Sequence, residues 1–245
     1  MSTLVELIPR PLEEEVAESV AVEASAAEAS PAKTAASSLA SFAEEQIRRL
    51  VQRVFLTGRN KRARQVVFSA VDQETDVASL CMLLGEALSR QDSGTTCVVE
   101  AQPCPWAKGT VEDIAPANYQ KRFGVLRDAA QQLSHRLWFM PRNVLLDGNG
   151  NDGRFSALWL RGRLAELRLE FDYTVLQGPA AGAHSEAALL GSLCDGVVLV
   201  LRANSTRRLA AQRVKEVLHA ANARVLGAVL SERTFPIPEA IYKRL

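Results

Sequence analysis

Three carboxylates are concentrated in residues 72–79, a short polar segment that follows an apolar run and precedes an amphipathic one. Residues 66–68 have the β-branched and aromatic composition of a strand, and apolar residues then recur at helical spacing from Val77 to Leu88. In α/β proteins, the first strand–loop–helix turn commonly binds phosphate through unpaired amides at the helix N-terminus. Residues 72–79 include no glycine and no lysine, so the position suits a phosphate site and the chemistry does not.

The carboxylates of this segment, Asp72, Glu74 and Asp76, have a second interpretation. Negative charge at a helix N-terminus is favoured by the unpaired amides and the macrodipole, by about 0.3 to 1 kcal/mol per group. We therefore expect the chain's own carboxylates to lie where a phosphate would otherwise bind and to stabilise the unliganded fold. A phosphate or nucleotide ordered on this segment would contradict that expectation.

Strand-like and helix-like segments alternate along most of the chain, and they position this loop. Further strands are expected at 96–102, 136–141, 171–177, 197–201 and 224–230. Helices are expected around 121–133 and at 158–169, 184–193 and 206–221, the last with Ser205 or Thr206 as its N-cap. This alternation, with continuous aliphatic runs in the later strands, predicts an α/β fold with a mostly parallel sheet flanked by helices.

Residues 42–56 have the pattern of an amphipathic helix, with Phe42, Ile47 and Phe55 among the residues of one apolar face. The polar face carries one favourable and one like-charge pair at a spacing of four residues. It is either a solvated face or a contact surface, and its candidate interface residues are Glu45, Arg48, Arg49 and Arg53.

The composition predicts one ordinary domain and a tail. Residues 1–42 are rich in Ala, Ser and Glu and hold few large apolar groups, so they are expected to form a disordered acidic tail before a domain at 43–245. The formal net charge of +1 provides no argument for a nucleic-acid partner. Four cysteines without paired spacing indicate a reduced, cytoplasmic chain without a metal site.

Four sequence blocks, residues 171–180, 185–190, 194–208 and 223–230, carry the apolar strands and polar turns of the second half. They resemble the bacterial tyrosine kinases of capsule and exopolysaccharide synthesis, which are MinD/ParA-like P-loop NTPases. The resemblance extends over residues 43–245 and implies a P-loop NTPase-like domain. Residues 45–48 also resemble the start of the family's E-x-x-R-x-x-R helix, which implies ring assembly, although Val51 replaces the last arginine.

The same resemblance places the family's P-G-E-G-K-S/T loop in register with residues 73–78, and Ser79 follows. Glu74 and Asp76 then replace glycines, Val77 replaces the lysine, and Ala78 replaces the magnesium ligand. A carboxylate about 4 Å from a phosphate charge costs about 1 kcal/mol even at the dielectric constant of water.

Two further positions depart from the family in the same direction. Glu100 and Gln102 lie at the end of the strand where the family has an aspartate pair, so one carboxylate is retained and one is lost. Gln177 replaces the aspartate at the end of the Walker-B-like strand, and a neutral amide is a poor ligand for a hard cation. His184 follows that strand and either faces the same crevice or serves a structural role.

The resemblance therefore implies a catalytically degenerate member of the family, with no catalytic residues, no metal and no cofactor. Its expected role is that of an interaction or regulatory module in exopolysaccharide or capsule synthesis or export. The implied partners are a membrane-embedded chain-length or export protein, an active paralogue, or further copies of the chain. Such a protein is expected in the cytoplasm, recruited to the inner face of the plasma membrane through its partner.

Two alternatives remain open from the sequence. One is an ATP-binding tyrosine kinase or ATPase with an unusual phosphate loop, which requires ATP and Mg²⁺ and predicts stabilisation by Mg-ATP. The other is a ParA-like DNA partition protein that uses the basic residues 59–64. It predicts binding that weakens steeply with salt, and the nearly neutral chain makes it the less favoured.

Overall fold

The computed structural model describes residues 4–6, 31–57, 62–102, 126–146 and 157–232. Their strands form one eight-stranded sheet, in which all neighbours are parallel except β4 and β5. The spatial order is β1 (Leu4–Glu6), β8 (Val225–Ser231), β7 (Gly196–Arg202), β2 (Gln65–Ala70), β6 (Tyr173–Gln177), β3 (Thr96–Glu100), β5 (Leu137–Met140) and β4 (Gln131–Ser134). The predicted α/β class and mostly parallel sheet are confirmed.

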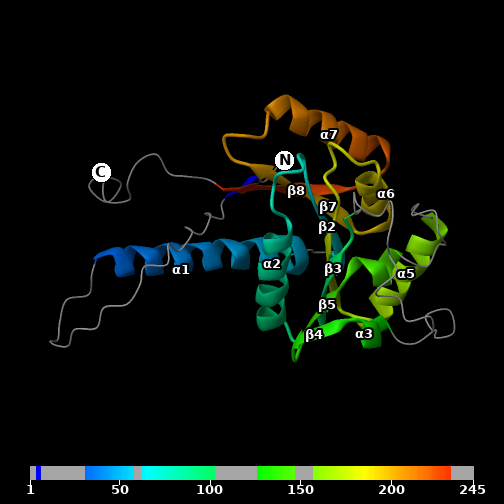
Figure 1. Ribbon diagram of the computed structural model, residues 1–245, viewed down its shortest axis with the longest axis horizontal. Coiled ribbons are helices and arrows are strands. Elements are labelled where there is room, and N and C mark those ends of the chain that lie inside the picture. Colours follow the sequence, from blue (N-terminus) through cyan, green and yellow to red (C-terminus); the bar gives the residue numbers. More distant parts are fainter. Residues whose placement is uncertain (1–3, 7–30, 58–61, 103–125, 147–156, 233–245) are drawn as a thin grey trace, which may run out of the picture.

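Helices cover both faces of the sheet (Figure 1). One face packs against α1 (Pro31–Val51), its π-helical continuation η1 (Gln52–Leu56) and α2 (Ala78–Gln91). The other packs against α3 (Leu126–Ala129), α4 (Arg142–Leu146), α5 (Ala157–Glu170), α6 (Glu186–Leu193) and α7 (Arg208–Ala220). Within the described residues, no helix has both the length and the apolar character that crossing a bilayer requires.

The central strand β2 is buried at all six positions. Val67 packs on the α5–α7 side, whereas Val66 and Phe68 pack on the α1–α2 side. Apolar neighbours on both faces explain the hydrophobic run at residues 66–68, whereas the buried Gln65 and Ser69 donate hydrogen bonds to backbone carbonyls. Because β6 and β7 pair in parallel with β2, the carboxyl ends of the three strands meet at one edge, where ligands bind in open α/β sheets.

Helix α2 follows this edge directly, and its predicted apolar face is confirmed. Val77, Leu80, Cys81, Leu84 and Leu88 are each no more than 2% exposed and pack against the sheet. Burying a leucine side chain fully contributes about 1.5 to 3 kcal/mol, so this face holds α2 firmly against the strands.

Two predicted boundaries differ from the structure. Of the helix expected around 121–133, α3 covers Leu126–Ala129, while Gln131–Ser134 form β4 by pairing with β5, and 121–125 lie outside the described residues. Pairing with a neighbouring strand here overrides local helix propensity.

At the N-terminus, α1 begins at Pro31 rather than near residue 42, which suits an alanine-rich run with proline in its first turn. Leu4–Glu6 extend the sheet beside β8.

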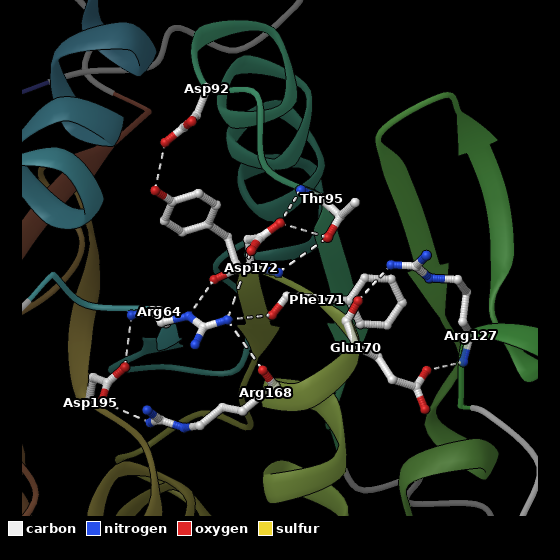
Figure 2. Close-up of polar contacts among 10 residues, drawn as sticks. Arg64, Asp92, Thr95, Arg127, Arg168, Glu170, Phe171, Asp172 and Asp195 are labelled. Carbon is white, nitrogen blue, oxygen red and sulfur yellow. Dashed lines mark hydrogen bonds and ion pairs between the residues drawn. The ribbon is translucent and has the colours of Figure 1, made fainter.

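A polar network fixes the amino ends of the central strands (Figure 2). The Asp195 carboxylate, just before β7, accepts hydrogen bonds from the backbone amides of Arg64 (2.7 Å) and Gln65 (2.9 Å) and from Arg168 Nη2 of α5 (2.8 Å). Arg168 Nε donates to the buried Gln65 Oε1 (2.8 Å), and Gln65 Nε2 donates to the Leu164 carbonyl (2.7 Å). One carboxylate thus joins β2, β7 and α5.

The network continues toward β3. Arg64 donates to the carbonyls of Arg168, Phe171 and Asp172. The Asp172 carboxylate accepts from the Thr95 amide (2.8 Å) and hydroxyl (3.0 Å). The amino ends of β2, β6 and β3 are therefore fixed relative to one another by side chains as well as by the sheet.

Replacing the Asp195 carboxylate should destabilise the fold. Burial alone would raise the pKa of Asp195, but hydrogen bonds from Arg168 and two backbone amides outweigh it and lower that pKa below its usual value. We expect Asp195→Asn to lose about 1 to 3 kcal/mol at pH 7 in urea unfolding. Because a lowered folded-state pKa stabilises above the unfolded value of about 3.9, the loss should shrink as the pH falls below about 4.

The matched control is Asp128→Asn, which removes an exposed carboxylate from α3. It should change the free energy of unfolding by less than about 0.5 kcal/mol. Equal effects of the two substitutions, or a loss for Asp195→Asn that does not depend on pH, would contradict the role assigned to this network.

Candidate functional site

The candidate site is the loop of residues 71–77, which joins β2 to α2 at the carboxyl edge of the sheet. Its first residue remains tied to the neighbouring strand, because the Val71 amide donates to the Val200 carbonyl of β7 (3.3 Å). The loop therefore lies between the start of α2 and the connection from β7 to α7. This is the place where the sequence predicted a degenerate phosphate site.

Asp72 is held by two hydroxyl groups. Thr75 Oγ1 donates to its Oδ1 (2.5 Å), and Thr206 Oγ1, from the β7–α7 connection, donates to its Oδ2 (2.9 Å). Burial would raise the pKa of Asp72, but these hydrogen bonds and the nearby Arg202 outweigh it and leave the pKa below its usual value. Asp72 is thus a charged bridge between the two loops.

Glu74 forms an ion pair with Arg202, the last residue of β7, at 2.6 Å between Oε2 and Nη2. The same nitrogen donates to the Ser205 hydroxyl (2.7 Å). The hydrogen bond to Glu74 raises the pKa of the Arg202 guanidinium. The Glu74 side chain is 76% exposed, so solvent weakens this ion pair and the pair contributes little to the stability of the fold. Its main effect is that the Arg202 guanidinium is already bound to a carboxylate of the chain.

Asp76 is the carboxylate that lies at the start of α2. Its Oδ1 accepts a hydrogen bond from the Ser79 amide (3.1 Å), as an N-capping side chain does. The expectation that all three carboxylates would occupy the helix N-terminus is therefore met at Asp76, whereas Asp72 bonds to Thr206 of the β7–α7 connection and Glu74 bonds to Arg202 at the end of β7.

The residue that the resemblance aligns with the phosphate-binding lysine is part of the core. Val77 is 2% exposed and packs with the buried residues of α1 and α2. Ala78 and Ser79, which follow it, are exposed in the first turn of α2. The chain therefore has no cation at this position, and its backbone here is fixed by apolar packing.

The structure brings two of the predicted strand-end residues together. Glu100, the last residue of β3, is opposite Gln177 of β6 in the parallel register, and Gln177 is opposite Phe68 of β2. Because side chains alternate along a strand, all three lie on the α2 side of the sheet. Gln102 lies two residues beyond β3, and its carbonyl accepts from Arg142 Nη1 (3.4 Å).

The segment after β6 closes against the base of the loop. The Gly178 amide donates to the Phe68 carbonyl (2.8 Å), and the Ala181 amide donates to the Ala70 carbonyl (2.8 Å). A Cβ at Gly182 would collide with the Val71 carbonyl oxygen, so this close approach requires glycine. His184 also reaches the loop, with its Nε2 3.3 Å from Gln73 Nε2.

Sequence reasoning missed two residues that bond to the loop, Arg202 at the end of β7 and Thr206 in the β7–α7 connection. Thr206 was expected to be a candidate N-cap, but α7 begins at Arg208 after Arg207, and no side chain caps it. Its hydroxyl instead accepts from the Arg202 amide (2.9 Å) and donates to Asp72. The available signal was the parallel order of the sheet, which places the end of β7 beside the end of β2.

The candidate interface residues lie on α1 and η1, away from this loop. Glu45 accepts from Arg49 Nε (2.8 Å) and from Arg48 Nη1 (3.2 Å), and the side chains of all three are at least 40% exposed. Arg53 is exposed in the π-helical segment. Phe42, expected on the apolar face, is 39% exposed, whereas Ile47 and Phe55 are buried as predicted.

The loop is electrostatically self-contained. The loop itself carries three carboxylates, Asp72, Glu74 and Asp76, and the nearby guanidinium of Arg202 already binds Glu74. Among residues 31–57, 62–102, 126–146 and 157–232, no cluster of three or more His, Cys, Asp or Glu side chains could hold a metal ion. An incoming phosphate would have to displace Glu74 from Arg202 and would meet the charges of Asp72 and Asp76.

Comparisons with known proteins agree with this fold. No protein-family model matches the chain. Two curated tyrosine-protein kinases match part of it: CpsD of Streptococcus agalactiae is 34% identical over 62 residues, and YwqD of Bacillus subtilis is 29% identical over 76 residues. The alignments cover 25% and 31% of this chain and 27% and 32% of the relatives, so they span a third or less of either relative.

Solved structures are similar over most of the chain. The kinase domain of Escherichia coli tyrosine kinase ETK matches with a TM-score of 0.60 at 14% identity, over 80% of this chain and 79% of that one. The chimerical protein CapA2B2 matches at 0.60 and 13%, over 78% and 85%. The MinD cell division protein of Aquifex aeolicus matches at 0.51 and 16%, over 74% and 73%. The fold is that of MinD/ParA-like P-loop proteins, and the predicted relation to bacterial polysaccharide tyrosine kinases is confirmed.

The capping role of Asp76 can be measured directly. Asp76→Ala removes the acceptor for the Ser79 amide and should lower the free energy of unfolding by about 0.5 to 2 kcal/mol. Asp76→Asn retains an oxygen acceptor and should lose less. Chemical denaturation of both variants checks this. An alanine variant that is as stable as the parent chain, or more stable, would show that repulsion among the loop carboxylates outweighs the cap.

Proposed function

We propose that this chain, which has homologues among bacterial polysaccharide tyrosine kinases, acts in capsule or exopolysaccharide synthesis or export as an interaction or regulatory module rather than as a kinase. The observation that carries the proposal is the burial of Val77 in the core at the position of the phosphate-binding lysine. The relation to the kinases supports the pathway, and the chemistry of the loop supports the loss of phosphoryl transfer.

Phosphoryl transfer depends on positioning and on positive charge around the transferred group. Here the nearby guanidinium of Arg202 is bound to Glu74, and Asp72 and Asp76 add negative charge. Each carboxylate at about 4 Å from a phosphate charge costs about 1 kcal/mol in water and more in a partly buried loop. At the strand ends, Gln177 offers an amide where a hard cation prefers a carboxylate. The proposed module uses neither ATP nor Mg²⁺.

A melting experiment separates this proposal from an ATP-dependent kinase with an unusual loop, the activity named for the relatives. A ligand at 100 times its dissociation constant stabilises the folded form by about 2.7 kcal/mol. For a domain of this size, that corresponds to a rise in melting temperature of roughly 5 to 10 °C. We expect no rise with millimolar Mg-ATP, while an active polysaccharide tyrosine kinase domain shows one in the same buffer. A clear rise for this chain would reject the proposal.

The polar face of α1 is the proposed surface for partners. Glu45, Arg48 and Arg49 form exposed pairs that contribute little to stability, so their charges are free to recognise another chain. The proposed partner is a membrane-embedded chain-length or export protein, or an active kinase paralogue, and this choice follows from the partial sequence match to the tyrosine-protein kinases CpsD and YwqD. Such a partner would recruit the chain to the inner face of the membrane.

Charge reversal tests this surface. Glu45→Arg combined with Arg48→Glu exchanges the two charges at the same spacing and removes the Arg49–Glu45 ion pair, and it should weaken binding to the solubilised chain-length protein by about tenfold or more. The matched control is Glu86→Arg with Arg90→Glu, which inverts another exposed helical pair, on α2. Binding measured by surface plasmon resonance should be unchanged in the control. Equal binding by both double variants would exclude α1 as the surface.

A further inference from the structure

Helix α5 is apolar on two opposite sides. On the inner side, Leu160, Leu164 and Leu167 are each no more than 2% exposed and pack against the sheet. On the outer side, Leu158 is 82% exposed and Leu169 is 87% exposed, the two highest values for large apolar side chains in the described part of the chain. A helix with apolar residues on both sides is expected to be covered on both. Among the residues that the structure describes, none buries Leu158 or Leu169 on the outer side.

The exposed apolar residues follow a two-helix packing pattern. Leu158, Gly162, Ala165 and Leu169 are spaced by four, three and four residues, as are the contact positions of a heptad. All four are exposed, and a Cβ at Gly162 would meet nothing within 4 Å. The two small residues at the centre leave room for a second helix to approach closely between the leucines.

Charges beside this stripe point to the orientation of the second helix. On a helical projection, Arg161 lies on one flank of the stripe and Glu166 on the other. In a parallel pair of identical helices, the opposite flanks meet, so Arg161 of one copy faces Glu166 of the other, five residues further along. In an antiparallel pair, the same flanks meet, and Arg161 would face the arginine side of the other copy.

We propose that two copies of this chain associate by packing α5 against α5 in parallel, about a twofold axis that runs along the helices. The surface is self-complementary, as a twofold interface requires. Arg161 is exposed and makes no hydrogen bond or ion pair with the residues that the structure describes, so it is available to the second copy. Glu166 is bound to Arg163 through Oε2 (2.8 Å), with 42% of its side chain exposed.

This interface is distinct from the α1 surface and does not depend on the proposed function. Figure 1 shows α5 on the opposite side of the sheet from α1 and α2, in agreement with the two separate core clusters. The pattern lies in α5 alone and leaves the β2–α2 loop untouched.

Sedimentation equilibrium of the full chain tests the association. We expect a monomer–dimer equilibrium in the micromolar range, and Leu169→Glu should raise the dimer dissociation constant by at least about tenfold. The matched control is Leu209→Glu, which places the same charge on an exposed leucine of α7 (69% exposed) and should dimerise like the parent chain. A parent chain that stays monomeric at 100 µM or more, or a Leu169→Glu variant that dimerises normally, would overturn the proposal.

Two further tests, a charge swap and a cysteine cross-link, address the parallel orientation. Arg161→Glu and Glu166→Arg should each weaken the dimer, and their combination should restore it, because the swapped charges face each other again. Leu158→Cys should form a covalent dimer under mild oxidation that the parent chain does not form, since the two copies of residue 158 adjoin in a parallel pair. An antiparallel pair about the centre of the stripe would separate them by about 16 Å. Absence of this cross-link in a chain that dimerises, or failure of the charge swap, would reject parallel packing.

Discussion

The burial of β2 on both faces is the constraint on which the rest of the structure depends. Because all six residues are buried and the apolar ones pack into the clusters on both faces, β2 is suited to the middle of the sheet, where it lies between β6 and β7. Its amino end is then fixed by the Asp195 carboxylate, which joins the strand to β7 and to α5. A strand fixed in this way delivers its carboxyl end, and the loop that follows, to one defined place at the sheet edge.

At that edge, the chain supplies from its own side chains what a bound phosphate would supply in a nucleotide-binding loop. Asp76 caps α2, Thr75 and Thr206 bind Asp72, and Glu74 binds Arg202. The polar groups are thereby satisfied without a ligand, and Val77 adds apolar packing instead of charge. A loop that is already ordered by internal bonds gains little from a phosphate, which would first have to break them. The same contacts explain the stability of the loop and the proposed loss of catalysis.

The sequence allowed prediction of the elements whose signal is local. The β-branched run of β2 and the apolar spacing of α2 each have a period that identifies them, and both were placed correctly. The ion pair of Glu74 with Arg202 joins residues 128 positions apart, and neither side chain carries a local sign of the other. Strand β4 was missed because Gln131–Ser134 are exposed throughout and show no alternation, so pairing with β5 alone defines them. Contacts between residues that are distant in sequence depend on the folded topology, so local sequence patterns do not predict them.

Because the polar groups of the loop at the sheet edge bind one another, the surfaces left for function are those of the helices. The polar face of α1 and the outer side of α5 differ in chemical character. The α1 face is charged, and charged surfaces chiefly govern association rate and partner choice. The outer side of α5 is apolar, and apolar burial governs how long a complex lasts. Pairing through α5 would give each dimer two α1 surfaces. If partner molecules are clustered in a membrane, a dimer binds them twice, and the second contact is intramolecular, which raises apparent affinity without any new contact on α1. A dimer formed through α5 would thus compensate for the weak binding expected of a recognition surface built from exposed ion pairs.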